Sequence, residues 1–327
     1  MRKYKYISIL LKKQFESFFL PGDGDRDRIF NVLKKRRGYA LSLLAAFLSL
    51  IGASGLHAQE KKFCLKITGG ISSFVLGDVN AYIEDTLRFK ADDLESAGYV
   101  IDRELEKFHA GRDIEISILI PIAQHFHLTI GSGYLSAEKE NNTYILNSSF
   151  STLTGILNHT VKAIPISLGI HYSLRVSTKS RLYLFSSGEF YFSKFLESGE
   201  QRLDLKSGFP GYDHTWDAET KATGLGFSGG LGFELGLSSN ISFLIEAKGR
   251  FARISGFSGT GTSRYDSSKD ELDIHLYYYE FTVSALEDSY RMLDLPNADH
   301  GFPLAVLRDA VIDLSGFSLK AGIKIGL

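Results

Sequence analysis

The sequence predicts an all-β fold: an eight-stranded antiparallel transmembrane up-and-down β-barrel with short periplasmic turns and long extracellular loops. Three observations carry this prediction. Apolar and polar residues alternate with a period of two in segments near the length of a membrane strand. Short connections between these segments alternate with long ones. A basic N-terminal stretch precedes an uncharged run rich in Leu and Ala, which is the layout of a secretory signal.

The charge distribution separates the targeting segment from the folded part. Residues 1–37 carry eleven basic and four acidic side chains and residues 38–58 carry none, so 59–327 holds 26 basic and 34 acidic residues. We expect an N-terminal extension plus signal peptide over 1–58, cleaved near Ala58, and a single outer-membrane β-barrel domain over 59–327. An uncleaved helical anchor is the alternative, since the apolar run approaches the length that spans a bilayer. The acidic remainder argues against nucleic acid as a partner.

The first four strands are predicted at about 63–72, 114–122, 127–138 and 161–174. The second is the most regular, because isoleucine occupies every second position from Ile114 to Ile122, opposite Glu115. In the fourth, apolar residues from Ile164 to Leu174 alternate with small or polar ones. Alternation of this kind predicts strands with one apolar and one polar face.

The last four strands are predicted at about 181–194, 224–236, 241–251 and 317–327. The fifth strand is aromatic throughout, so its facing is ambiguous and allows a bulge. The sixth alternates Leu and Phe with glycine, and the seventh sets Ile and Phe opposite charged residues. The eighth ends at Leu327, and closure of the barrel requires it to pair with the first.

The connections differ in length in a regular way. Those after the second, fourth and sixth strands are short, at about 123–126, 175–180 and 238–240. Those after the first, third, fifth and seventh are long, at about 75–111, 140–158, 196–221 and 256–312. We expect a helix at Asp92–Phe108 in the first long loop. The aromatic run Tyr277–Phe281 in the last is interpreted as a strand that packs on the core of its own loop; an exposed contact surface is the alternative.

The polar strand faces point into the predicted barrel, whose interior is just wide enough for side chains to fill. We expect an ion-pair network there, with Glu234 and Glu246 offsetting the lysines, because buried charges are tolerated only when paired. The glycines of the sixth strand are expected to leave room for the long basic side chains. The alternative places some of these charges at strand ends, in solvent. The network is predicted to contain Lys66, Glu115, Glu234, Glu246, Lys248, Arg250, Lys320 and Lys324.

No catalytic, cofactor-binding or metal-ligating residues are assigned. His171 and Ser173 share one strand face, as a base and a nucleophile must, but they face inward near a short turn and are expected to be packed lumenal residues. His125 and His127 are expected to lie in a solvated turn, because no third metal ligand is evident. The spacing of a calcium loop is missing from the acidic pairs Asp92-Asp93 and Asp270-Glu271.

Three segments resemble a known family: Ala163–Tyr172 with its internal proline, Arg181–Phe185, and the glycine-rich Gly226–Leu235. They are similar to the outer-membrane β-barrel domain family common in Bacteroidota and related bacteria, which includes PorT-like and OmpA-like eight-stranded barrels. The chain departs from the family in its long fourth loop and in ending at Leu327, where many outer-membrane proteins end in an aromatic residue. The resemblance implies fold and location. It implies no single activity, since such barrels serve as anchors, adhesins, porin-like proteins or secretion accessories.

The function expected from these observations is non-enzymatic and either structural or based on binding. The expected partners are outer-membrane lipid, the barrel-assembly machinery, and an extracellular ligand or protein bound through loops 75–111 and 256–312. A narrow porin-like channel is the main alternative. Two further alternatives are a lipid-modifying enzyme that uses His171 and Ser173, and a soluble lipocalin-like barrel, in which the apolar strand faces would point inward.

Overall fold

The computed structural model describes residues 63–85, 98–206, 211–265, 268–283, 288–294 and 304–327. Contacts divide the chain into Met1–His57 and Ala58–Leu327, and only the second unit contains described residues. The predicted signal, its cleavage near Ala58 and the alternative helical anchor therefore lie outside the described part. Within the described ranges, no helix is long and apolar enough to cross a membrane.

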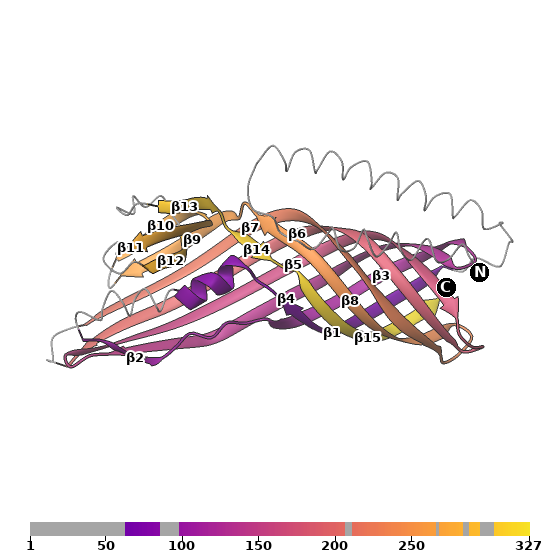
Figure 1. Cartoon of the computed structure of the whole chain (residues 1–327), viewed down its shortest axis with the longest axis horizontal. Helices are drawn as coiled ribbons and strands as arrows, with labels where there is room; N and C mark the ends of the chain where they lie inside the picture. Colours follow the sequence, from indigo (N-terminus) through magenta and orange to yellow (C-terminus); the bar gives the residue numbers. More distant parts are fainter. Residues whose placement is uncertain (1–62, 86–97, 207–210, 266–267, 284–287, 295–303) are drawn as a thin grey trace. The chain divides into compact units, whose positions relative to one another are not determined.

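Eight long strands pair into a ring (Figure 1). In ring order they are β1 (Cys64–Phe74), β3 (Ala110–Ala123), β4 (Phe126–Asn147), β5 (Ser151–Arg175), β6 (Ser180–Leu205), β7 (Tyr212–Gly236), β8 (Ile241–Ser255) and β15 (Gly316–Gly326). All neighbours are antiparallel, and β15 returns to β1 with Lys66 opposite Lys324. The predicted fold class and the pairing of the last strand with the first are confirmed.

The short connections also lie where the alternation predicts them. β3 joins β4, β5 joins β6 and β7 joins β8 through tight turns of a few residues, all at the same end of the barrel. The bulge allowed in the fifth predicted strand is absent from β6, whose register with β5 and β7 runs without interruption. The facing of β6 is therefore the same along its whole length.

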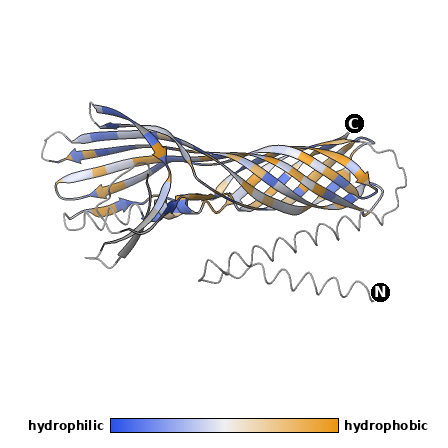
Figure 2. Cartoon of the chain, turned by 90° about the horizontal axis from the view of Figure 1, so that it is seen from above, coloured by the Kyte–Doolittle hydropathy of each residue, from blue (hydrophilic) through white to orange (hydrophobic). Residues whose placement is uncertain are grey.

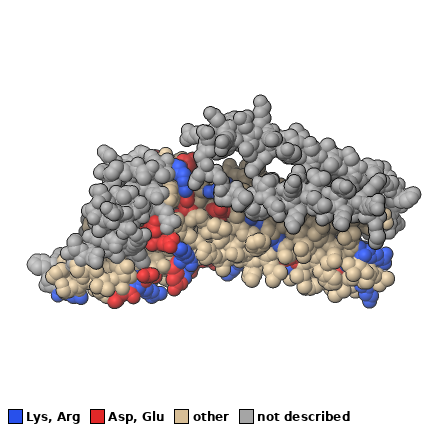
Figure 3. Space-filling view, in the orientation of Figure 1, with Lys and Arg blue, Asp and Glu red and all other residues tan. Residues whose placement is uncertain are grey.

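The apolar strand faces point out of the barrel. Ile114 is 51% exposed, Leu225 75% and Leu319 58%, whereas the residues on either side of each are buried or half-buried. Figure 2 shows hydrophobic residues concentrated in the half of the barrel that carries the C terminus, and in Figure 3 the visible surface of that half carries few charged side chains except at its tip. These outward apolar residues form a continuous surface, which we call the belt. A surface of this kind faces lipid rather than water. The lipocalin-like alternative, which requires these faces to point inward, is wrong.

The long connections consist largely of strand. Segment 140–158 is mostly the outer part of a β4–β5 hairpin, and 196–221 is mostly the outer part of a β6–β7 hairpin. We call the described residues beyond the belt, at the end opposite the short turns, the extension. β-Structure in the extension explains how connections of this length are ordered, since each strand satisfies its neighbour's backbone hydrogen bonds.

The remaining elements also belong to the extension. They are β2 (Val100–Arg103), β9 (Ser258–Tyr265), β10 (Ser268–His275), β11 (Tyr277–Val283), β12 (Asp288–Asp294), β13 (Leu304–Asp309) and β14 (Val311–Asp313). The helix expected at Asp92–Phe108 is absent from residues 98–108, which contain β2 and irregular chain, and the rest of that segment lies outside the described part. Residues 78–85 of the same connection form a helix.

The extension has a hydrophobic core of its own. Val79 and Ile83 of the helix 78–85, Phe257 and Ile312 are almost fully buried against inward-facing residues of the long strands. Tyr278 of β11 joins this core, which confirms the packed interpretation for that residue. The side chains of Tyr279, Glu280 and Phe281 lie outside the described part. Inside the barrel, therefore, the polar lumen of the belt is followed by this apolar core, which we call the plug.

Candidate functional site: a charged lumen beneath an apolar plug

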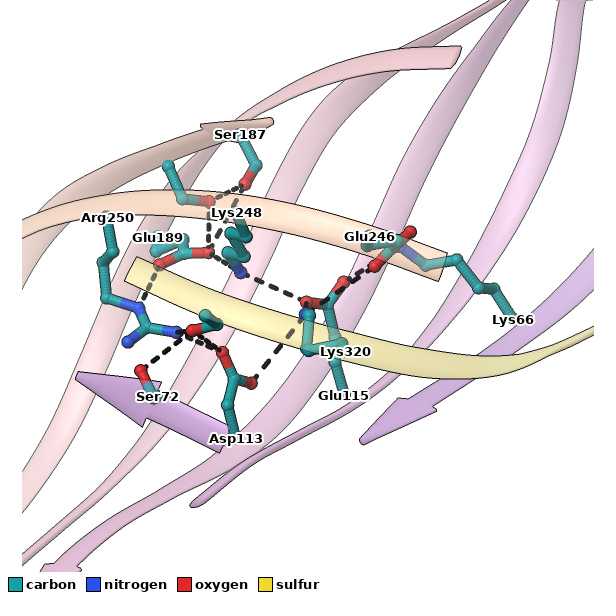
Figure 4. Close-up of polar contacts among 12 residues, drawn as sticks. Lys66, Ser72, Asp113, Glu115, Ser187, Glu189, Glu246, Lys248, Arg250 and Lys320 are labelled. Atoms are coloured by element: carbon teal, nitrogen blue, oxygen red, sulfur yellow. Dashed lines mark hydrogen bonds and ion pairs between the residues drawn. The ribbon is translucent and has the colours of Figure 1, made fainter. Parts of the chain in front are cut away.

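The eight residues of the predicted network all lie inside the barrel, each no more than 9% exposed. Figure 4 shows how most of them meet: basic side chains of β1, β8 and β15 converge on acidic side chains of β3, β6 and β8. β4 and β5 present small residues there, such as Gly131 and Ser167. The lumen is thus asymmetric, with its long charged side chains on one wall and room for them at the other.

Glu115 lies at the centre of the network. Its carboxylate is 2.7 Å from Lys320, 3.1 Å from Lys248 and 3.5 Å from Lys66. Glu246 takes a second contact to Lys66, at 2.8 Å, and lies 3.8 Å from Lys320. Two carboxylates thereby hold three lysines that would otherwise repel one another.

Two acidic residues of the network were not predicted from the sequence. Glu189 on β6 contacts Lys248 at 2.7 Å and Arg250 at 3.9 Å. Asp113 on β3 pairs with Arg250 and accepts a 2.8 Å hydrogen bond from Ser318. Asp113 continues the alternation of β3 one step beyond its predicted start. Glu189 lies in the strand whose aromatic residues on both faces concealed its facing.

A separate pair lies nearer the short turns. Lys324 of β15 forms an ion pair with Glu234 of β7, and Ser242 donates a 2.9 Å hydrogen bond to the same carboxylate. With this pair, the charged side chains of the lumen are Lys66, Lys248, Arg250, Lys320 and Lys324 against Asp113, Glu115, Glu189, Glu234 and Glu246. These five buried cations and five buried anions balance in charge, and Arg181 of β6, opposite Glu234, is exposed at the short-turn end.

The inward glycines of β7 make room for tyrosines rather than for the basic side chains that we expected. A Cβ at Gly232 would lie 2.3 Å from the ring of Tyr183, and one at Gly226 would lie 2.9 Å from the ring of Tyr191. Tyr183 donates a 2.9 Å hydrogen bond to Glu246, and Tyr191 donates one to Glu189. The glycines therefore position two phenols that stabilise the buried carboxylates.

Polar contacts at the start of the helix 78–85 hold it in place within the plug. Asp78 accepts hydrogen bonds of 2.6 and 2.8 Å from the guanidinium of Arg308 and one of 2.7 Å from the backbone of Val311. The Asn80 amide donates to the Phe108 carbonyl at 2.9 Å and accepts from its N–H at 3.2 Å. These contacts fix the helix to two chain segments that are distant in sequence.

Phe74 and Tyr191 connect the two layers. Both rings belong to the core of the plug. The guanidinium carbon of Arg250 lies 5.7 Å from the centre of the Phe74 ring, within cation–π range. The rings of the plug nearest the belt therefore contact the charged groups of the network nearest the extension. The ion pairs and the apolar core are in direct contact in the described interior.

His159, in the extension, is fully buried. Its ring is sandwiched between Phe108 and Phe195, with centroid distances of 6.4 and 6.1 Å. Loss of water around the ring lowers the pKa of His159, and the Glu197 carboxylate 3.7 Å away opposes this shift only in part. The imidazole is therefore neutral at neutral pH and packs as an aromatic side chain.

His127, His171 and Ser173 lie at the short-turn end. His171 and Ser173 are both buried in the lumen, where the His171 ring stacks on Tyr183 at 4.5 Å. His127 was expected in a solvated turn, but its ring packs edge-on against His171 at 5.6 Å and its Nδ1 is buried. Asp270 and Glu271 are exposed on β10, and Asp92-Asp93 lie outside the described part. Within the described ranges, no group of three or more His, Cys, Asp or Glu side chains could hold a metal ion.

The outer surface of the extension has a hollow of about 790 Å³. Two rows of cross-strand partners on β5, β6, β7, β9 and β10 line it. The first row is Asn158, Ser198, Asp217, Thr262 and Glu271, and the second is Thr160, Leu196, Glu219, Thr260 and Asp273. Five of the lining residues, including Glu197, are acidic and none is basic. Sequence reasoning missed this hollow because the two hairpins were expected to be loops.

Taken together, the ring, the belt and the filled lumen define the class: a membrane-spanning β-barrel. No protein-family model and no curated protein matches the chain. Among solved structures, it is similar to the outer membrane protein OprG of Pseudomonas aeruginosa, with a TM-score of 0.34 and 10% identity over 82% of this chain and 97% of that one. It is also similar to the outer membrane protease OmpT of Escherichia coli, with a TM-score of 0.26 and 10% identity over 84% and 100%. Both likenesses are low, so the class rests on the chain's own geometry.

Proposed function

We propose that this protein is an integral outer-membrane β-barrel that conducts no ions, catalyses no reaction and holds a β-structured binding surface outside the cell. The observation that carries the proposal is the closed interior. A porin-like protein needs a continuous aqueous path, whereas here the belt is filled by paired charges and the space beyond it by an apolar core.

The charges of the lumen support a structural role. Charged side chains that line an ion pathway face water and are not fully paired with one another. Here the charged side chains contact one another and are almost completely buried. A buried ion pair fixes the relative position of its strands, because any displacement leaves a charge without a partner. The network thus sets the register of β1, β3, β6, β8 and β15.

The outer-membrane location is supported by two features of the chain. An export signal is predicted at 1–58, and closed barrels with an outward apolar belt are the β-structures that a bilayer tolerates. Insertion then requires the barrel-assembly machinery as a transient partner. The resemblance to the Bacteroidota family agrees with this location and stays a prediction.

The binding part of the proposal rests on the extension. Segments 75–111 and 256–312 contribute β2, β9, β10 and the plug, and the hollow of about 790 Å³ lies partly on β9 and β10. Its acidic lining disfavours anionic ligands. The enzymatic alternative has less support, because His171 and Ser173 lie inside the barrel at the end away from the extension.

Conductance measurements test the closed lumen. We expect the purified, folded barrel to insert into planar bilayers without producing discrete current steps at neutral pH. The control for correct folding is a shift in gel mobility between unboiled and boiled samples of the same preparation. Stable single-channel steps from the folded protein would instead support the narrow channel, which the charged lumen favours over the remaining alternatives.

A further inference from the structure

A row of basic side chains follows the outer edge of the apolar belt. Arg112 on β3, Lys162 on β5, Lys194 on β6 and Lys221 on β7 are linked through successive cross-strand pairs, with Ser136 of β4 between the first two. We call these four residues the basic row. All four side chains point outward, on the same face as the belt.

The row on the lipid side of these residues is apolar on β3 to β6, and on β7 it contains Thr223. Two positions along each strand toward the short turns, the outward residues are Ile114 on β3, Ile164 on β5 and Phe192 on β6, each about half exposed. Ile114 pairs with Tyr134 of β4, and Ile164 pairs with Phe192. On these strands, the surface changes from lipid-facing to basic within a single step of the alternation.

The row on the other side is not basic. There the outward residues are Glu138, Thr160, Leu196 and Glu219, joined by the same cross-strand pairing. The basic side chains of this face thus form a line at the boundary of the belt, between apolar and partly acidic rows. In a membrane-inserted barrel, such a line coincides with the headgroups of the outer leaflet.

The basic row keeps an excess of positive charge. Glu219 contacts both Lys194, at 2.7 Å, and Lys221, at 3.0 Å, and Glu138 lies 3.9 Å from Arg112. Two carboxylates therefore contact three of the four cations. The side chains also remain accessible: that of Arg112 is 76% exposed and that of Lys221 is 70% exposed.

We propose that the basic row binds the phosphate groups of anionic lipid headgroups in the outer leaflet. This inference rests on the proposed membrane insertion, with the extension outside. Basic residues next to an anionic lipid surface attract it over about one Debye length, and lysine and arginine are the side chains that best match phosphate oxygens. The row would hold the barrel at a fixed depth by its headgroup contacts.

The test is lipid binding by the full-length folded barrel in a neutral detergent, measured by native mass spectrometry with added phosphatidylglycerol or phosphatidylcholine. We expect more phosphatidylglycerol than phosphatidylcholine to bind. The double variant Lys162→Gln/Lys194→Gln should weaken phosphatidylglycerol binding by about fivefold for each lysine removed. The matched control is Arg264→Gln/Lys269→Gln, which removes the same charge from β9 and β10 and should bind phosphatidylglycerol as the unaltered chain does.

Three results would overturn the inference. They are equal binding of the two lipids, equal losses in the two double variants, and displacement of bound lipid by inorganic phosphate at the same concentration, which would point to a free anion site. A barrel that folds and conducts ions but still prefers phosphatidylglycerol would refute the proposed closed lumen without contradicting lipid binding by the basic row. A chain that fails to form a heat-modifiable barrel would refute the membrane class itself.

Discussion

Replacing Glu115 with Gln is expected to destabilise the folded barrel by about 3–5 kcal/mol, because it leaves buried cations without their partner. Glu115 is the carboxylate that three lysines share, and Lys320 beside it is fully buried. The measurement is the urea midpoint for loss of the folded, faster-migrating gel band. Glutamine keeps the size of the side chain and removes only its charge.

The control for this variant is the same substitution in an exposed pair. Glu84 lies 2.9 Å from Lys107 with both side chains nearly half exposed, so Glu84→Gln should change stability by less than about 1 kcal/mol. Adding Lys320→Met to Glu115→Gln should recover part of the loss, since it removes one of the unpaired cations. Equal effects of Glu115→Gln and Glu84→Gln would contradict the structural role of the network.

Replacing Phe257 with Ala is expected to loosen the plug by about 3–5 kcal/mol while leaving the belt intact. Phe257 is fully buried in the apolar core, and its carbonyl accepts the 2.9 Å hydrogen bond from the N–H of Leu276. Hydrogen exchange should quicken at Leu276 and Ala310, whose amides are bonded in this region. Amides in the belt portions of β6 and β7 should keep their protection.

Phe150→Ala is the matched control, because Phe150 is 63% exposed at the tip of the β4–β5 hairpin. It deletes the same ring without opening a cavity, so little change in exchange is expected. Faster exchange throughout the barrel in Phe257→Ala would contradict a plug that is stabilised independently of the belt. Unchanged exchange at Leu276 would contradict the packing of the plug.

The belt was predictable from the sequence because its environment is constant along each strand. Lipid outside and polar side chains inside impose one alternation, as in Ile164, Ile166 and Leu168 on β5. Beyond the belt the two faces of each strand meet the opposite environments: the outer face meets water and the inner face meets the apolar core. On β5 the buried apolar residues Leu157 and Val161 therefore occupy the opposite parity.

This inversion explains why the strands were predicted too short. At the boundary, the apolar residues change face, which appears in the sequence as the end of an alternating segment. The same change occurs on β6 between the exposed Phe192 and the buried Phe195. An inversion of parity between two alternating segments is thus a sequence signal for a membrane strand that continues into a water-exposed extension.

The candidate site was predictable to the extent that its residues follow the belt alternation. The positions of Lys66, Glu246 and Lys320 follow from it directly. Their individual partners do not, because contacts across the lumen depend on barrel closure and stagger, which strand periodicity leaves open. The plug required long-range packing of the helix 78–85 with β14, for which the local sequence has no signal.

The central claim is that the apolar faces meet lipid while the extension lies in water, and the chain's single tryptophan allows a direct measurement. Trp216 lies in the outer part of β7, where it donates a 3.0 Å hydrogen bond to Glu197. Leu231, on the same strand, is 58% exposed on the belt. Fluorescence in vesicles of lipids brominated on the acyl chains compares the unaltered chain with Leu231→Trp in a Trp216→Phe background. We predict strong quenching of the tryptophan at 231 and none of Trp216; quenching of Trp216 with an unquenched residue at 231 would contradict the account.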